Sequence, residues 1–230
     1  MPTILVTGAN RGLGLEFIRQ YRDAGWRVYA CCRSPKEAGE LQSLAAASSG
    51  RVALHALEVT DLPRIEALAK ELRDVALDVL LNNAGIYGPN NGGVGHIDYR
   101  AWAEVFAVNT MGPMKMAECF LDHVAKSERK VIASVSSQMA SIAQNGGGHY
   151  PYRSSKAALN MVMRGLAADL RPRGIIAVPL DPGWVQTDMG GSSAPMRPPE
   201  SIRGLRQVID GLRLEDSGKF LRYDGSEVPW

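Results

Sequence analysis

Short apolar segments alternate with helical patterns along almost the whole chain. Several of these segments are apolar at nearly every position, as expected for strands that a parallel sheet buries on both faces. They span residues 2–8, 27–32, 51–57, 77–82, 130–136, 174–180 and 219–225. Helical periodicity occupies residues 13–24, 36–47, 62–75, 99–125 and 152–170. The alternation predicts a doubly wound α/β (Rossmann) domain, with a parallel seven-stranded sheet and helices on both faces.

Three glycine-rich or proline-rich stretches interrupt this pattern, at residues 87–95, 144–148 and 190–199. They are too short to separate two domains, and we expect them to be loops. A chain of 230 residues can bury one sizeable core. We therefore predict a single domain over residues 1–230.

The charge balance excludes several classes of partner. The net charge is +2, from 26 basic and 24 acidic residues that are scattered along the chain. Neither nucleic acid nor an anionic membrane is favoured by such a balance. No apolar stretch reaches 18 residues, and the beginning of the chain enters a strand without a signal-peptide pattern. We expect a cytoplasmic protein with no membrane span.

Cysteine and histidine are too sparse for structural cross-links. Cys31 and Cys32 lie inside an apolar segment, Cys119 is distant, and the four histidines are not at ligand spacing. Buried reduced thiols are the ordinary state for such cysteines. The sequence predicts neither a disulfide framework nor a metal site.

Three glycines follow the first predicted strand, in the segment TILVTGANRGLG. Glycine at positions 8, 12 and 14 permits a tight turn and lets backbone N–H groups approach a pyrophosphate at the start of a helix. The spacing GxxxGxG differs from the GxGxxG fingerprint, and its position between strand and helix carries the prediction. A glycine-rich connector without a ligand is the alternative.

The end of the second predicted strand indicates which nucleotide would bind. An NAD site usually has an acidic residue there for the ribose 2′-hydroxyl, but this strand ends in Ala30-Cys31-Cys32-Arg33. The Arg33 guanidinium could bind a 2′-phosphate, with Arg11 as a second positive charge. NADPH is therefore predicted over NADH. The alternative is that Arg33 is a solvated strand end.

Tyr152 and Lys156 lie one helical turn apart in the segment YPYRSSKAALN. A lysine ammonium beside a phenol favours the phenolate, so the pair predicts a tyrosine with a lowered pKa that transfers protons. Taken alone, the segment is more often an ordinary helix start with a solvated lysine.

Several motifs together resemble the short-chain dehydrogenase/reductase family. In order they are Thr7-Gly8-x-x-x-Gly12-x-Gly14, Asn82-Asn83-Ala84-Gly85, Asn109, Tyr152-x-x-x-Lys156 and Pro182-Gly183. A narrower likeness, to sniffer-like and C-factor-like carbonyl reductases, rests on TGANRGLG, PGWVQTDMGG and the ending YDGSEVPW. In those relatives the residue before Pro182 is often His, so Asp181 is a departure.

The resemblance implies catalytic roles for four residues. Tyr152 would donate the proton to a carbonyl oxygen, and Lys156 would hold the nicotinamide ribose and lower the Tyr152 pKa. Ser137 would bond the same oxygen, with Ser136 as the alternative. Asn109 would anchor a proton relay to Lys156.

The resemblance also implies a set of residues that contact NADPH along the nucleotide. Glu58 stands where the family usually has Asp, and its longer side chain would accept from the adenine amino group. The full set is Gly8, Asn10, Arg11, Gly12, Leu13, Gly14, Arg33, Glu58, Val59, Asn83, Ala84, Gly85, Tyr152, Lys156, Pro182, Gly183, Val185 and Thr187.

These residues predict an NADPH-dependent reductase of aldehydes, ketones or quinones. The family architecture would form an apolar substrate pocket from Tyr87, Met139, Gln144, Trp184 and Met189. A nucleotide-binding signalling protein of the C-factor type, with little turnover, is the alternative. Apolar positions on helices 99–125 and 152–170 would pair in a homodimer or homotetramer, unless they are simply core.

Overall fold

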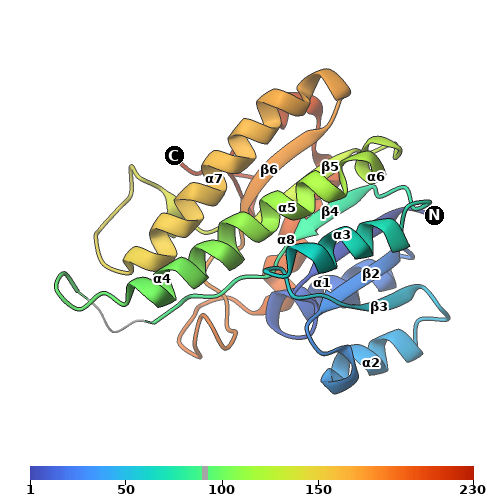
Figure 1. Cartoon of the computed structure of the whole chain (residues 1–230), viewed down its shortest axis with the longest axis horizontal. Coiled ribbons are helices and arrows are strands. Elements are labelled where there is room, and N and C mark those ends of the chain that lie inside the picture. The colour runs from blue at the N-terminus through green and yellow to red at the C-terminus, as the bar shows by residue number, and fades with distance from the viewer. Residues whose placement is uncertain (90–92) are drawn as a thin grey trace.

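The computed structural model describes residues 1–89 and 93–230, and of the predicted loop at 87–95 residues 90–92 lie outside the described residues. Seven strands form one sheet in the order β3-β2-β1-β4-β5-β6-β7, and every neighbouring pair is parallel (Figure 1). The strands are β1 Thr3–Thr7, β2 Arg27–Cys32, β3 Val52–Ala56, β4 Val79–Asn82, β5 Val131–Val135, β6 Ile176–Asp181 and β7 Leu221–Arg222. The predicted fold class is confirmed.

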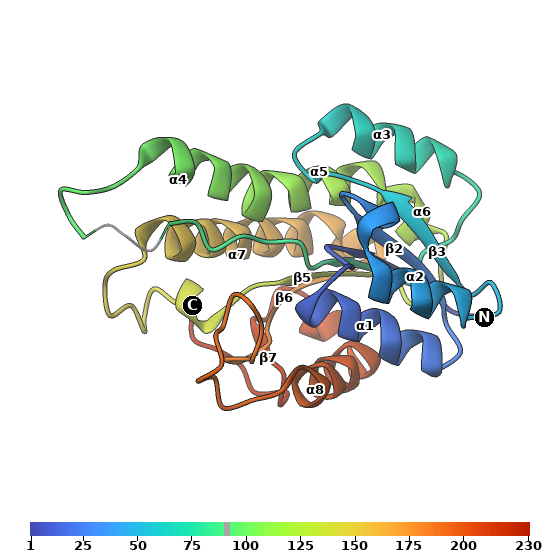
Figure 2. The same cartoon turned by 90° about the horizontal axis from the view of Figure 1, so that it is seen from below.

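Alternate residues of β1 to β6 contribute to two hydrophobic cores, one on each face of the sheet. In β1, Ile4 and Val6 belong to the first core and Leu5 to the second. Helices α1 Gly12–Asp23, α2 Gly39–Ala46 and α8 Pro198–Gly211 cover the first face. Helices α3 Leu62–Glu71, α4 Tyr99–Phe106, α5 Gly112–Cys119, α6 Leu121–Ala125 and α7 Tyr150–Leu170 lie on the other side (Figure 2).

The predicted helix at 99–125 is not one regular α-helix. A π-helical segment, Ala107–Met111, separates α4 from α5, and Phe120 separates α5 from α6. Pro113 explains part of the irregularity, because proline has no N–H group for the helical ladder. Single π turns of this kind occur frequently at functional sites, and this one carries Asn109.

Other element boundaries differ from the prediction because of local turns. The helix predicted at 36–47 is a 3₁₀ turn at Pro35–Glu37 followed by α2, and α7 begins at Tyr150 instead of Tyr152. Helix α3 and strand β7 are shorter than predicted, and β3 is shorter by one residue at each end. The sequence prediction missed α8, which packs Ile202, Leu205 and Ile209 into the first core.

The strand order brings the carboxyl ends of all seven parallel strands to one edge of the sheet. The chain reverses its direction of winding between β1 and β4, and ligands of open α/β sheets bind in the crevice at such a point. Across residues 1–89 and 93–230, none of the helices combines the length and apolar character that a membrane span requires.

Candidate active site

The glycine loop after β1 packs directly on the loop after β4. The Thr7 hydroxyl accepts hydrogen bonds from the backbone N–H groups of Asn83 (3.0 Å) and Ala84 (3.1 Å). The Asn83 side-chain amide donates to the carbonyl oxygens of Thr7 (2.9 Å) and Gly8 (3.2 Å). Thr7 was part of a predicted motif but had no predicted role, and it joins the two loops.

Glycine is required at two positions of this loop for different reasons. Gly8 has φ +65°, a left-handed conformation, and a Cβ built on it would come within 2.8 Å of the Ala84 Cα. A Cβ on Gly14 would overlap the Gly8 carbonyl oxygen. The first turn of α1 can therefore approach the end of β1 closely only without a side chain at position 14.

The start of α1 has the properties of an anion site. Its N-cap residue, Arg11, makes no side-chain cap within the described chain, and the first turn contains no acidic residue. The N–H groups of a helix's first turn lack intrahelical partners, and the helix dipole favours negative charge there. A pyrophosphate fits this position, so the residues present agree with a dinucleotide cofactor.

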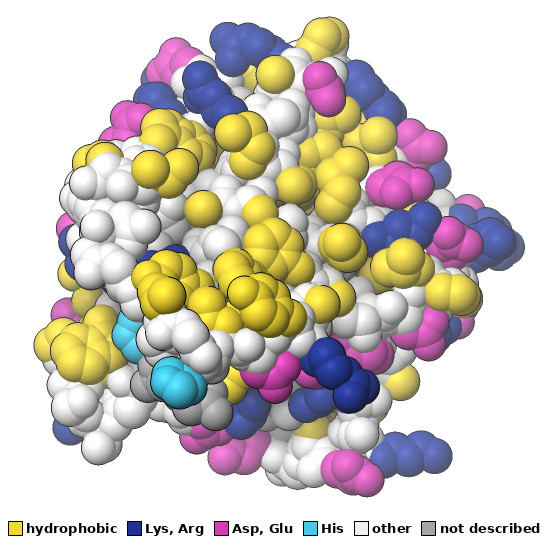
Figure 3. Space-filling model, turned by 60° about the vertical axis from the view of Figure 1, so that its left-hand side comes forward, with side chains coloured by type: hydrophobic (Ala, Val, Ile, Leu, Met, Phe, Trp, Pro, Cys, Tyr) yellow, Lys and Arg dark blue, Asp and Glu magenta, His cyan; other side chains and the backbone are white. Residues whose placement is uncertain are grey.

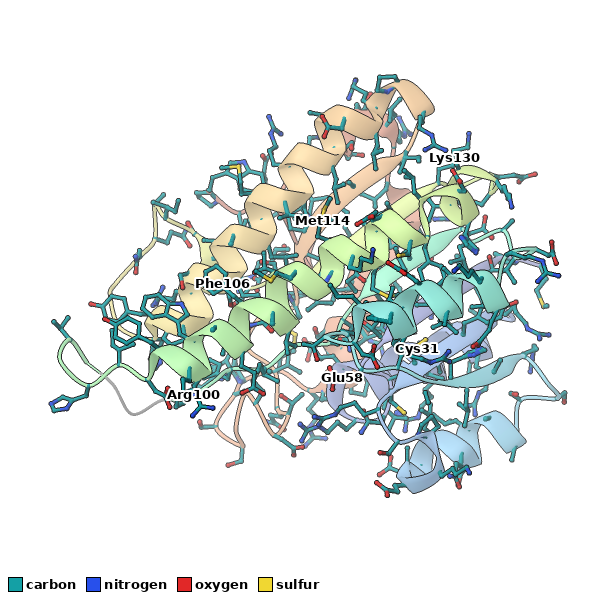
Figure 4. The ribbon with its side chains drawn as sticks, viewed as in Figure 1. Cys31, Glu58, Arg100, Phe106, Met114 and Lys130 are labelled. Carbon is teal, nitrogen blue, oxygen red and sulfur yellow. The ribbon has the colours of Figure 1, made fainter. Side chains whose placement is uncertain are left out.

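Both arginines predicted to meet the 2′-phosphate face carboxylates. The Arg33 Nε lies 3.8 Å from the Glu58 carboxylate, and both side chains are solvent accessible. Arg11 donates a 2.7 Å hydrogen bond to Asp188, which lies in the loop after β6. Glu58, labelled in Figure 4, follows the end of strand β3 at Ala56 by two residues. Arg33 and Glu58 are therefore neighbours at the predicted adenosine end.

Tyr152 lies on α7 at the carboxyl edge of the sheet, next to Ser137 in the loop after β5. The Tyr152 side chain is buried, and its ring stacks on Tyr87 with 4.5 Å between the centroids. The Ser137 hydroxyl accepts a hydrogen bond from the Met139 N–H (3.1 Å), which leaves its own proton free to donate. The Ser136 hydroxyl donates instead to Asn160 (2.6 Å) and is buried.

The expected effect of Lys156 on the Tyr152 pKa does not appear in this structure. Burial raises the pKa of the Tyr152 phenol, the Ser137 hydroxyl opposes that rise, and the nearby Tyr87 and Asp181 add to it. The Lys156 Nζ lies 5.9 Å from the centre of the Tyr152 ring and donates to the Val135 carbonyl oxygen (2.8 Å). Burial lowers the pKa of Lys156 itself to about 8. Desolvation, which spacing along a helix does not report, therefore dominates both pKa values.

Asn109 connects the π-helical segment to the loop after β4. Its amide donates to the Ile86 carbonyl (2.8 Å) and to the Ser155 hydroxyl (3.0 Å), and its oxygen accepts from the Ile86 N–H (2.9 Å). A Cβ on Gly85 would lie 3.3 Å from the Asn109 oxygen and 3.4 Å from the Lys156 Nζ. The structure thus brings Asn109, Lys156 and Gly85 together.

The remaining predicted residues lie along the same edge of the sheet but differ in accessibility. Asn10 is exposed, Leu13 is half-buried against the first core, and Val59 is buried in the second. After β6, the Pro182 carbonyl accepts from Ser201 (2.7 Å), Val185 is buried, and the Thr187 hydroxyl accepts from the Gly190 N–H (3.0 Å). The Val59 side chain is therefore part of the second hydrophobic core.

The predicted substrate side is apolar and open. Trp184 and Met189 are exposed, and the Tyr87 hydroxyl lies 3.9 Å from the Met139 sulfur. His149, which the sequence did not single out, packs edge-on against Tyr87 from a left-handed backbone conformation (φ +48°). A cavity of about 220 Å³ is lined by Met139, Tyr150 and Arg153 among others.

The sheet has seven parallel strands, with a glycine loop at the first helix and a Ser, Tyr and Lys cluster at its carboxyl edge. These features define a Rossmann-type α/β protein with an oxidoreductase-like site. The chain belongs to the short chain dehydrogenase family, whose model matches residues 2–198.

The chain is similar to a protein named C-signal and to solved structures of carbonyl reductases. C-signal of Myxococcus xanthus is 46% identical over 167 residues, which cover 72% of this chain and 100% of that protein. The carbonyl reductase Sniffer of D. melanogaster superposes with a TM-score of 0.95 at 34% identity, and 100% of each chain is covered. The NADPH-bound carbonyl reductase from chicken fatty liver gives a TM-score of 0.92 at 36% identity, over 100% of this chain and 99% of that one. These matches confirm the predicted likeness to sniffer-like and C-factor-like proteins, and the predicted cofactor agrees with the NADPH-bound neighbour.

Proposed function

We propose that this protein is an NADPH-dependent carbonyl reductase that converts an aldehyde, ketone or quinone to an alcohol. The proposal rests above all on the position of Tyr152, buried beside the Ser137 hydroxyl at the edge where the glycine loop and α1 begin. When bound, NADPH would supply the hydride. The chain's own residues would supply orientation, hydrogen bonds and the proton.

Negative charge develops on the carbonyl oxygen during hydride addition. A phenol at Tyr152 and a hydroxyl at Ser137 that both point at this oxygen would stabilise the transition state more than the ground state. The raised pKa of Tyr152 keeps the phenol protonated at neutral pH, as a proton donor requires. In this role Lys156 is held at the end of β5 through the Val135 carbonyl, and Asn109 holds the loop after β4 through the Ile86 backbone.

The remaining predicted residues would bind the nucleotide. The N–H groups of the glycine loop, from Gly8 to Gly14, would hold the pyrophosphate, and Asn83 to Gly85 would line the adjoining ribose. The loop of Pro182 to Thr187 would contact the carboxamide. Glu58 and Val59 would lie at the adenine.

The direct test is to assay the purified protein for NADPH consumption with a panel of aldehydes, ketones and quinones. Turnover of at least one compound at a rate that depends on protein concentration supports the proposal. The C-signal relative favours a second candidate, a nucleotide-binding signalling protein. Tight NADPH binding with no turnover of any compound would favour that candidate.

The choice of NADPH predicts a selective effect of Arg33. Its replacement by alanine removes charged hydrogen bonds to a 2′-phosphate, each worth roughly 1.5–3 kcal/mol. NADPH affinity should fall by about tenfold or more, while NADH affinity stays almost constant. Arg73→Ala is a matched control, because the Arg33 and Arg73 side chains are both 77% exposed. Equal losses for both nucleotides in the Arg33 variant would contradict the assignment.

A homodimer or larger homo-oligomer is also proposed from the apolar side chains on α4, α5 and α7. Met111 is 62% exposed and Met161 is 72% exposed, and hydrophobic side chains gather on the face seen in Figure 3. Phe106 and Met114 lie between the α4–α5 helices and α7 in the view of Figure 4. Exposed apolar side chains that gather on one face are typical of subunit interfaces.

Light scattering at micromolar concentration should therefore give at least twice the chain mass of 24.9 kDa. Met114→Glu should shift the mass toward that of one chain, because a charge is costly in an apolar interface. Leu62→Glu is the control, since Leu62 on α3 is 42% exposed and Met114 is 40% exposed. A wild-type mass near 24.9 kDa would contradict the assembly.

A further inference from the structure

The cavity of about 220 Å³ next to the candidate active site has no part in the proposed proton transfer. Its lining residues come from the segment 139–148 and from the beginning of α7. Met139 lines the cavity, and its sulfur lies 3.9 Å from the hydroxyl of Tyr87. The Tyr87 ring in turn stacks on Tyr152. Two side-chain contacts therefore connect the cavity wall to the proposed proton donor.

Most of the side chains around this cavity are apolar or already hydrogen-bonded. The Ser141 hydroxyl donates to the Trp230 carbonyl oxygen (3.3 Å), and the Ser154 hydroxyl donates to a backbone carbonyl of its own helix. The side-chain oxygen of Asn145 accepts from a backbone N–H group two residues further on (2.9 Å). The cavity wall therefore favours a ligand that is largely hydrocarbon. The apolar side chains that line it belong to Met139, Ala140, Ile142 and Ala157.

Arg153 brings a positive charge to this apolar wall, and it follows Tyr152 directly on α7. The side chain is half-buried, and none of the ion pairs within residues 1–89 and 93–230 includes it. Its Nη1 donates a long hydrogen bond to the Met139 carbonyl oxygen (3.4 Å), and its Nε is buried without a partner in the described chain. Because a buried polar group without a partner is costly, the guanidinium is suited to receive an anion.

The beginning of α7 favours negative charge at the same place. Its first turn contains no acidic residue, and the N-cap residue His149 makes no side-chain cap within the described chain. Tyr150 in this turn lines the cavity together with Arg153. The dipole of a helix attracts anions at its N-terminus. One guanidinium balances the single charge of a carboxylate and can bind both of its oxygens, whereas a phosphate monoester carries nearly two charges. A carboxylate is therefore the anion that fits.

We propose that this cavity binds a carboxylate through Arg153, so that the substrates of the protein include oxo acids. These are compounds in which a hydrocarbon segment joins a carbonyl group to a carboxylate. The inference rests on the proposed reductase function and names a substrate class for it. The hydrocarbon segment would pack on Met139 and Ile142 while the carbonyl group meets Ser137 and Tyr152. Arg153 would select substrates and take no part in hydride or proton transfer.

Substrate pairs that differ only in charge test this role during turnover. A series of ω-oxo acids of increasing chain length is compared with the corresponding methyl esters. For at least one length, wild-type kcat/KM should be about tenfold or more higher for the acid, as a charged hydrogen bond would give. Arg153→Met should remove this preference, mainly through a higher KM for the acid. Arg153→Lys should keep part of it, because an ammonium keeps the charge but not the planar fork of donors.

Arg164→Met is the matched control, because it removes the same charge from the same helix. Arg164 does not line the cavity, and its Nη1 donates to the Gly218 carbonyl oxygen (2.9 Å). Its preference for acid over ester should match that of the wild type. Equal kcat/KM for acid and ester at every chain length in the wild type would overturn the inference, and so would equal losses of the preference in the Arg153 and Arg164 variants.

A binding measurement that needs no turnover distinguishes this inference from the proposed function. Calorimetry measures the affinity of hexanoate and of the neutral hexanamide, with and without saturating NADPH. Hexanoate should bind the wild type about tenfold or more tightly than hexanamide does. The difference should disappear in Arg153→Met, with Arg153→Gln as a second variant should the first fail to fold. Equal affinities, including no measurable binding of either compound, or a difference that persists in the variants would overturn the inference. If hexanoate is preferred but no carbonyl compound is reduced, only the proposed function fails.

Discussion

Replacement of Tyr152 by phenylalanine is expected to lower kcat for carbonyl reduction by at least ~10²-fold, the usual contribution of a positioned general acid. The substitution keeps the aromatic ring and its stack on Tyr87, so the fold and NADPH affinity should stay near wild type. It removes the proton that the carbonyl oxygen would receive. Steady-state rates with a saturating carbonyl compound, together with NADPH binding by fluorescence, measure the two quantities separately.

Tyr150→Phe is the matched control for this result. Tyr150 is two residues away on α7 and, together with Met139, lines a cavity whose lining residues do not include Ser137 or Tyr152. Its loss of a hydroxyl should leave kcat within a few-fold of wild type and change mainly which substrates bind. Wild-type rates in Tyr152→Phe, or equal losses in both variants, would remove Tyr152 from the proposed role.

Lys156→Met is expected to reduce both kcat and NADPH affinity while it removes a pH-dependent cost to stability. The Lys156 pKa is about 8 in the folded protein, against an ordinary value of 10.5. Below pH 8 both the folded and unfolded states bind the proton, and the folded state bears the full cost of a buried ammonium. Between about pH 8 and 10.5 the unfolded state binds more protons than the folded state, so the free energy of unfolding rises with pH.

Because of this difference in pKa, the contribution of Lys156 to the free energy of unfolding should rise by roughly 3 kcal/mol between pH 7 and about pH 10.5. Urea unfolding of both proteins at a series of pH values would measure it. Buried phenols such as Tyr152 are present in both proteins and act in the opposite direction, so the difference between wild type and Lys156→Met isolates the lysine. If the difference in unfolding free energy between the two proteins does not change with pH, folding does not lower the Lys156 pKa. Full activity of the variant would contradict its catalytic role.

The sequence predicted what depends on residues close together in the chain. Alternating strand and helix patterns determined the doubly wound sheet, because each pattern reflects the period of its own element. The candidate site was predicted from two local motifs, the glycines at 8, 12 and 14 and the Tyr152–Lys156 spacing, because the members of each motif lie within a few residues of one another. Parallel strands then bring their carboxyl ends to one edge, so motifs far apart in the chain meet there.

The tertiary structure decided the properties that depend on contacts between distant segments. Asn160 of α7 holds the Ser136 hydroxyl, which leaves Ser137 as the serine beside Tyr152. Burial, and not the neighbouring lysine, sets the direction of the Tyr152 pKa, because desolvation comes from everything packed around the phenol. The bond from Gln138 to Asp181 and the ion pair with Arg222 join residues 43 and 41 positions apart in the sequence, across three segments that meet only in the folded chain.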